Sequence, residues 1–120
     1  MYSPQRVVMD AQSMSVNPTL TVLVSGLELG PCEFLSGEIY NQDVSQTLNC
    51  SVQCSWNGSR WADTGSDALS AIAPGESRPI SLDIMRYRFI RVVGTSSGAG
   101  LSAIVSAELG YSTGATRSNR

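Results

Sequence analysis

Apolar and polar side chains alternate without a fault from residue 47 to residue 56. The apolar positions are Leu48, Cys50, Val52, Cys54 and Trp56, and the residues between them are small and polar. Successive side chains of a strand point to opposite faces, so the pattern predicts a strand with one face in a core and one in water. This segment alone indicates an all-β chain.

Several other segments repeat the alternation or are rich in β-forming residues. They span residues 19–25, 33–41, 68–72, 80–84, 86–93 and 101–111. Ile90 interrupts the alternation within 86–93, which predicts a β-bulge. No segment predicts a convincing helix. About eight short strands at this spacing predict an antiparallel β-sandwich or jelly roll with extended N- and C-terminal arms.

The chain has 120 residues, enough for one domain with one core. Residues 1–18 are rich in polar and turn-forming residues, so we expect them to form an N-terminal arm. Within this arm, residues 6–10 can form one short strand. We expect the β-sandwich domain over residues 19–111 and a polar C-terminal tail over residues 112–120.

Asn57 and Gly58 form the strongest local signal. Asn-Gly is the favoured centre of a type I′ hairpin turn, because both residues tolerate positive φ. The sequence therefore predicts a tight hairpin with Trp56 and Trp61 near each other across it. Two interpretations stay open: a tryptophan pair that pins the turn, or a platform on which a ligand stacks.

Charge and composition limit the classes of partner that the chain is expected to bind. Charged residues make up 15% of the chain and the net charge is −2, with no basic footprint of the kind that nucleic-acid binders carry. No run approaches the ~20 apolar residues of a membrane-spanning helix, and no signal peptide is visible. All eight basic residues are arginines, which favours contacts at protein interfaces, although compositional bias is an alternative explanation.

Candidate chemistry is sparse. The chain has no histidine, so it has no Ser-His-Asp or Cys-His arrangement, and we expect neither an enzyme nor a cofactor. Cys50 and Cys54 share a strand face at a separation of about 13 Å, too far for a disulfide, and are interpreted as buried hydrophobes. A pairing of Cys32 with one of them stays open. We expect the oxygen-rich stretch 63–67 to be a polar turn and the glycine-rich stretch 94–100 to be a flexible hairpin loop.

Arg86, Arg88 and Arg91 concentrate positive charge near one predicted strand. They can bind an acidic partner, or form a solvated strand face with cross-strand acidic neighbours such as Glu108. Both interpretations stay open.

Residues 51–111 resemble the second half of a discoidin-type sandwich. The resemblance is carried by the segments Ser-Trp-Asn-Gly-Ser-Arg-Trp at 55–61, Arg-Tyr-Arg-Phe-Ile-Arg-Val at 86–92 and Ala-Glu-Leu-Gly at 107–110. It implies a sandwich whose loops at one end bind glycans or lipid head groups. The alternative function is thus a carbohydrate-binding module, with Trp56, Trp61 and Tyr87 stacking on sugar rings.

The whole chain also resembles small β-sandwich decoration or cement proteins of tailed bacteriophage capsids. The resemblance rests on compact β-structure, polar arms at both ends and the absence of lysine. It implies a structural protein on the capsid surface of the virion, assembled in the host cytoplasm. The implied partners are the major capsid protein and the chain itself, as a homotrimer; a neck or tail protein is a further alternative. The partner-binding residues that we expect are Arg6, Val7, Val8, Arg117 and Arg120.

Overall fold

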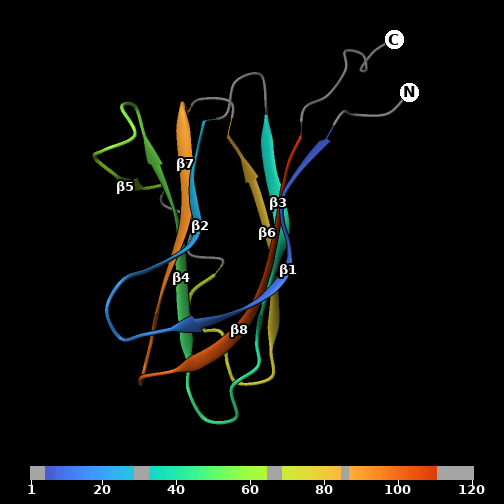
Figure 1. Ribbon diagram of the computed structural model, residues 1–120, viewed down its shortest axis with the longest axis vertical. Coiled ribbons are helices and arrows are strands. Elements are labelled where there is room, and N and C mark those ends of the chain that lie inside the picture. The colour runs from blue at the N-terminus through green and yellow to red at the C-terminus, as the bar shows by residue number, and fades with distance from the viewer. Residues whose placement is uncertain (1–4, 29–32, 65–68, 85–86, 111–120) are drawn as a thin grey trace.

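The computed structural model describes residues 5–28, 33–64, 69–84 and 87–110 of the chain. These residues form eight strands: β1 (Gln5–Val16), β2 (Thr21–Glu28), β3 (Phe34–Asn41), β4 (Leu48–Ser55), β5 (Ala62–Asp63), β6 (Ser77–Asp83), β7 (Phe89–Ser96) and β8 (Leu101–Gly110). The strands build two four-stranded sheets that face each other (Figure 1). Among the described residues there is no helix that could cross a membrane.

The strands pair in a nested order. The first sheet, sheet A, has the order β1-β8-β3-β6, and the second, sheet B, has the order β2-β7-β4-β5. Accordingly β1 pairs with β8, β2 with β7, β3 with β6 and β4 with β5, all antiparallel. One long hairpin that folds over into two sheets produces these nested pairs, which is the jelly-roll arrangement. The predicted all-β sandwich or jelly roll is confirmed.

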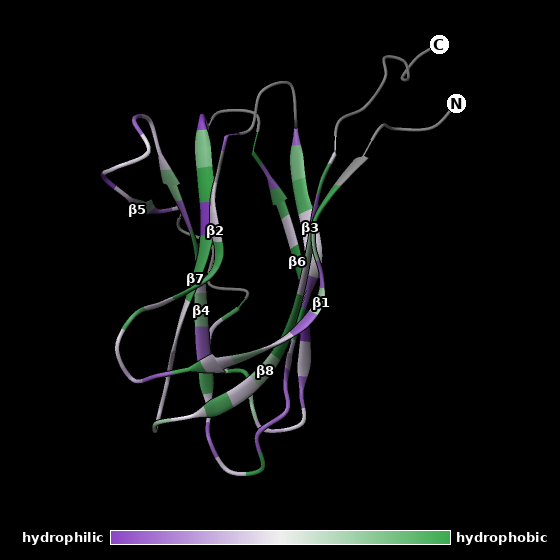
Figure 2. Ribbon diagram, viewed as in Figure 1, coloured by the Kyte–Doolittle hydropathy of each residue, from purple (hydrophilic) through white to green (hydrophobic). Residues whose placement is uncertain are grey.

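The inward-facing side chains of the two sheets make one apolar core. In β8, every second residue from Leu101 to Leu109 is fully buried. In β4, Leu48, Cys50 and Val52 are buried as the alternation predicts. Hydrophobic and more polar residues alternate along β4 in Figure 2. The last two apolar positions of the pattern are not part of the core. Cys54 is only half-buried, and Trp56 lies in the loop that follows β4.

The N-terminal boundary of the sandwich differs from the prediction. Residues 5–16, expected in an arm, pair with β8 from Gln5↔Gly110 to Val16↔Leu101. Val16 is fully buried in the core. Two register shifts interrupt the β1–β8 ladder, so the apolar positions of β1 are irregularly spaced and the periodicity hides the strand. The boundary at residue 18 is therefore wrong, while residues 1–4 and 111–120 lie outside the described part of the chain.

The expected bulge at Ile90 is also wrong, because the bulges of this sheet lie on β2. The β4–β7 ladder runs through Ile90 without a shift, whereas β2 shifts its register against β7 twice. A bulge places two residues of one strand opposite one residue of its partner. Consequently Leu23 and Val24 are both buried although they are neighbours, and Leu20 and Val22 are exposed.

Two connections differ from their predicted forms. Residues 69–72 make an isolated bridge to β4, Leu48↔Ile72, instead of the strand expected over 68–72. The segment after β7 is not a hairpin loop, because β7 lies in sheet B and β8 in sheet A. Residues 97–100 therefore carry the chain from one sheet to the other.

A polar network closes the end of the sandwich that holds the loops 42–47, 70–76 and 97–100, which we call the lower end (Figure 1). The buried Asn41 amide donates hydrogen bonds to the carbonyl oxygens of Gln46 (2.9 Å) and Ile72 (3.0 Å). Its Oδ1 accepts the N–H of Asp43 at 3.0 Å. Both polar atoms of the Asn41 side chain therefore have hydrogen-bond partners, as expected for a buried amide.

An ion pair supports the same end. Arg78 Nε lies 2.9 Å from Glu76 Oε2, and the Arg78 guanidinium also donates to the carbonyl oxygens of Ser70 (3.1 Å) and Ala71 (3.2 Å). The hydrogen bond from Arg78 lowers the pKa of the Glu76 carboxyl below its ordinary value, and the same bond raises the pKa of Arg78. The pair thus ties β6 to the segment that bridges to β4.

Candidate interaction surfaces

The loop between β4 and β5, residues 56–61, projects from the opposite end, which we call the upper end (Figure 1). The β4–β5 ladder ends at Cys54↔Ala62. The loop is therefore wider than the predicted two-residue type I′ turn, and that prediction is wrong. Gly58 has a φ of 79°, whereas Asn57 is not among the residues with positive φ, so only one of the two has the conformation that a type I′ turn requires.

Side-chain oxygens hold this loop in one shape. Asn57 Oδ1 accepts the N–H groups of Ser59 (2.8 Å) and Arg60 (3.0 Å). Ser55 Oγ accepts the N–H of Gly58 at 2.9 Å. Asn and Ser side chains commonly satisfy the backbone of turns in this way. The loop is thus ordered by its own bonds before any partner arrives.

Trp61 lies at the base of the loop, and a series of side-chain contacts connects it to the strands of sheet B. The Arg91 guanidinium lies 4.5 Å from the centre of the Trp61 ring, within the range of a cation–π contact. Arg91 Nε donates to Gln53 Oε1 at 2.9 Å, and Gln53 Nε2 donates to Asp63 Oδ1 at 3.4 Å. A Cβ atom on Gly26 would lie 3.0 Å from the Trp61 ring, so the ring packs directly on the backbone of β2.

The three aromatic residues expected to stack on sugars have different surroundings. Trp56 is 68% exposed at the start of the loop. Trp61 is half-buried between Arg91 and β2, and Tyr87 is half-buried against the core. Of these three rings, Trp56 alone is exposed, so they do not present one continuous platform.

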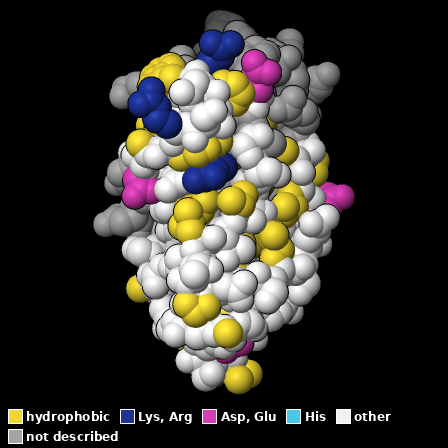
Figure 3. All heavy atoms as spheres, turned by 60° about the vertical axis from the view of Figure 1, so that its left-hand side comes forward, with side chains coloured by type: hydrophobic (Ala, Val, Ile, Leu, Met, Phe, Trp, Pro, Cys, Tyr) yellow, Lys and Arg dark blue, Asp and Glu magenta, His cyan; other side chains and the backbone are white. Residues whose placement is uncertain are grey.

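Arginine and hydrophobic side chains gather over the upper part of the sheet B face (Figure 3). Arg60 and Arg88 are exposed, and the Arg88 guanidinium lies 5.7 Å from the centre of the Phe89 ring. Glu108 lies on β8 in sheet A, so it is not a cross-strand neighbour of Arg88 or Arg91, and that interpretation is wrong. Arg86 lies outside the described residues.

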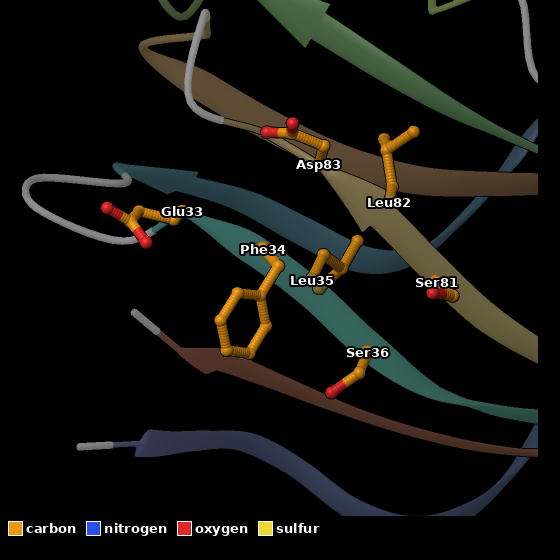
Figure 4. A pocket seen from close by; sticks show the side chains of 7 residues that line it. All are labelled: Glu33, Phe34, Leu35, Ser36, Ser81, Leu82 and Asp83. Atoms are coloured by element: carbon orange, nitrogen blue, oxygen red, sulfur yellow. The ribbon is translucent and has the colours of Figure 1, made fainter. Parts of the chain in front are cut away.

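A shallow hollow of about 320 Å³ lies over the ends of β3 and β6 in sheet A. Figure 4 shows Phe34 and Ser36 on the same side of β3, with Leu35 on the other. The register pairs Phe34 with Asp83 and Ser36 with Ser81, so these four side chains share the outward face. Glu33 and Asp83 bring two carboxylates to the hollow, and Phe34 provides an aromatic wall.

Only some of the expected partner-binding residues lie in the described part of the structure. Val7 is 54% exposed on β1, the edge strand of sheet A, and Val8 is half-buried against the core. The backbone of Arg6 lies in β1, opposite Leu109. The side chain of Arg6, and Arg117 and Arg120, lie outside the described part of the structure.

The cysteines of the described residues are free thiols. Burial raises the pKa of the Cys50 thiol to about 12, so it stays protonated and unreactive at neutral pH. Cys54 is also free and half-buried, and Cys32 lies outside the described residues. In the described part of the chain, no three metal-ligating side chains come together.

No protein-family model matches the sequence, and no curated protein matches it. Several solved structures have a similar fold. A chain of the Bacillus endospore appendages, a family of disulfide-linked pili, is similar with a TM-score of 0.64 and 11% identity, over 92% of this chain and 90% of that chain. The SPBc2 prophage-derived protein YomS has a TM-score of 0.57 and 8% identity, over 92% and 94%.

A chain of infectious bursal disease virus, Gx strain, has a TM-score of 0.58 and 10% identity. The similarity covers 91% of this chain but 31% of the viral chain, so it concerns one part of a larger protein. At sequence identities of 8–11%, these similarities concern the fold alone.

Proposed function

We propose that the chain is a non-enzymatic structural protein of a virus particle, which decorates or cements a bacteriophage capsid by bridging neighbouring capsid subunits. The observation that carries the proposal is a set of large apolar side chains left in water. The exposed fractions are 54% for Val7, 56% for Leu20, 41% for Val22, 93% for Val44 and 68% for Trp56. Burying them against other proteins favours association by about 25 cal/mol per Å² of apolar surface.

These side chains are spread over the molecule. Val7 lies on β1 of sheet A, Val22 on β2 of sheet B, Val44 at the lower end and Trp56 at the upper end. A single ligand site would gather such residues into one concavity. Their distribution over two sheets and two ends suits a protein that touches several neighbours at once.

The similarities in fold support the same proposal. Of the three similar structures described above, one comes from pili, one is prophage-derived and one comes from a virus. In a jelly roll, the outer faces of both sheets can contact neighbouring subunits while the core between the sheets stays unchanged. This property suits the subunit of a lattice.

The proposed partners are the major capsid protein and further copies of the chain, as a homotrimer on the capsid surface that assembles in the host cytoplasm. β1 supplies a lateral contact through Val7, with Val8 beside it and with Arg6, Arg117 and Arg120 pairing with carboxylates. No cofactor, nucleic acid or membrane takes part in this mechanism.

Particle composition tests the proposal. Mass spectrometry of purified particles should find the chain in a fixed ratio to the major capsid protein. Val7→Asp should lower that ratio at least tenfold, because it places a charge in a buried contact, whereas Ser15→Asp, at an exposed position of the same strand, is the matched control. A chain that stays in the soluble fraction and never enters particles would contradict the proposal, as would full occupancy of the Val7→Asp variant.

The exposed ring of Trp56 keeps carbohydrate binding as a second candidate. A glycan that stacks on this ring should change the tryptophan fluorescence, and Trp56→Ala should abolish the change. Val44→Ala, another exposed apolar position, is the control. A glycan array without a hit would remove this candidate.

A further inference from the structure

We propose that Asn57 is a deamidation site that the folded 56–61 loop protects, so that the reaction proceeds only where the hydrogen bonds of this loop are broken. The sequence contains one Asn-Gly pair, Asn57-Gly58. Both residues are exposed in a loop that projects from the upper end of the sandwich, so water reaches them (Figure 1). The inference concerns the chemistry of the loop itself and stands apart from the proposed function.

The reaction joins the backbone of Gly58 to the side chain of Asn57. The Gly58 nitrogen gives its proton to hydroxide and attacks Cγ of Asn57. The N–Cγ bond forms and the Cγ–Nδ2 bond breaks, and Nδ2 takes a proton back and leaves as ammonia, which gives a five-membered succinimide ring. Water then adds to one of the two ring carbonyls and opens the ring to aspartate or isoaspartate. Glycine favours the first step, because it has no Cβ atom beside the attacking nitrogen.

The hydroxyl of Ser55 holds both reacting groups in the unreacted loop. Its Oγ accepts the N–H of Gly58 at 2.9 Å and donates to Oδ1 of Asn57 at 3.1 Å. Ser55 is the last residue of β4 and is 3% exposed, so the folded sheet fixes its position. Ring closure removes the proton that Gly58 donates, so this hydrogen bond exists before the reaction and not after it. Ser55 therefore stabilises the unreacted form.

Two further hydrogen bonds fix the amide that is attacked. Oδ1 of Asn57 accepts the N–H groups of Ser59 (2.8 Å) and Arg60 (3.0 Å). A covalent N–Cγ bond is far shorter than a contact between unbonded atoms, so Cγ must move toward Gly58 and carry Oδ1 away from these donors. Gly58 is itself held from behind, since a Cβ atom on it would lie 3.7 Å from the Phe89 ring. Each hydrogen bond that the transition state loses slows the reaction about fivefold.

The reaction would also change the shape of the loop. In isoaspartate the backbone runs through Cβ and Cγ of residue 57, which lengthens the chain by one methylene group and makes the former Oδ1 a backbone carbonyl oxygen. The N–H groups of residues 58–60 then lose the arrangement of acceptors that holds them. Trp56 precedes the site and is 68% exposed. Protection of Asn57 therefore also preserves how this ring is presented.

The rate of deamidation in the folded and the unfolded chain tests the proposal. Incubation at neutral pH, followed by proteolysis and mass spectrometry, gives the fraction of Asn57 that is converted with time. Asn57 should react at least about tenfold more slowly in the folded wild type than in the same chain unfolded in guanidinium chloride, because folding adds the hydrogen bonds of the loop. This comparison needs no substitution, so it does not depend on how a variant folds.

A variant of Ser55 tests which bonds are responsible. Ser55→Ala removes a hydrogen bond from each reacting group, so it should speed the reaction about fivefold in a chain with an unchanged circular dichroism spectrum. Ser51→Ala, a serine of β4 outside the loop, is the matched control and should react at the wild-type rate. Equal rates in the folded and unfolded wild type, a faster reaction in the folded chain, or an unchanged rate in Ser55→Ala would each overturn the proposal. An equal rise in Ser51→Ala would do so too, because general loss of stability would then control the reaction.

Discussion

The lower and upper ends of the sandwich use the same kind of hydrogen bond for different purposes. At the lower end, Asn41 bonds to the backbone of two loops far apart in sequence. At the upper end, Asn57 and Ser55 bond only within their own loop, and Trp56 beside them stays in water.

The difference separates stability from association. An amide that links distant segments stabilises the whole domain, whereas an amide that orders one loop stabilises the shape of that loop. We therefore expect substitutions at the lower end to change the free energy of unfolding, and substitutions of exposed upper-end residues to change association.

Asn41→Leu should have the largest effect on stability. It leaves the carbonyl of Gln46 and the N–H of Asp43 without their Asn41 partner and removes one of the two hydrogen bonds to the carbonyl of Ile72, which costs about 2–3 kcal/mol of unfolding free energy. Urea denaturation followed by tryptophan fluorescence measures the change. Asn49→Ala is the control, because Asn49 also accepts a backbone N–H, that of Ala71 at 2.8 Å, but is exposed, so the loss should stay below about 1 kcal/mol. Equal losses in both variants would break the comparison.

The two tryptophans of the upper end should respond differently. Trp61→Ala removes a half-buried ring that packs on Gly26 and Arg91, so we expect a loss of about 1–2 kcal/mol in unfolding free energy. Trp56→Ala should change stability by less than about 0.5 kcal/mol, because the side chain is largely in water. Thermal unfolding of both variants, monitored by circular dichroism, sharpens the division within one loop. A large loss of unfolding free energy in Trp56→Ala would show that this side chain stabilises the domain rather than a contact with a partner.

Acid should weaken the lower end slightly through Glu76. Its pKa is lowered in the folded chain, so its carboxylate stabilises the fold above its ordinary pKa, and this contribution disappears as the pH falls through the lowered value. The pair is partly exposed, so the effect should be the smallest of the three. The difference in urea midpoint between the wild type and Glu76→Gln should be present at pH 7 and shrink as the pH falls below the ordinary pKa of a glutamate carboxyl. A difference that grows at low pH would contradict this account.

The regular strands could be predicted from the sequence, and the bulged strands could not. β8, and β4 as far as Val52, keep one residue per pleat, so their alternation corresponds directly to burial. β1 and β2 carry register shifts, and each shift exchanges the faces of the residues beyond it. Hence β1 was predicted as an arm, although Val16 at its end is fully buried.

The candidate surfaces depend on which strands are neighbours, and periodicity does not carry that information. The sequence offers Glu108 as a cross-strand neighbour of the arginines at 86–91, yet β8, which carries Glu108, lies in a different sheet from β7. The shallow hollow over the ends of β3 and β6 likewise arises from the β3–β6 register. The Asn-Gly signal located the β4–β5 loop correctly but not its width, because Asn57 uses its side chain rather than positive φ.

The nested pairing also has a consequence for synthesis on the ribosome. Both β1 and β3 pair with β8, which is made after the other seven strands. Until β8 emerges, sheet A consists of the β3–β6 pair alone, and the apolar side chains of β1 have no strand to join. Sheet A of the nascent chain therefore stays incomplete until β8 has been synthesised. Its completion requires β8 to insert between β1 and β3, which were made much earlier.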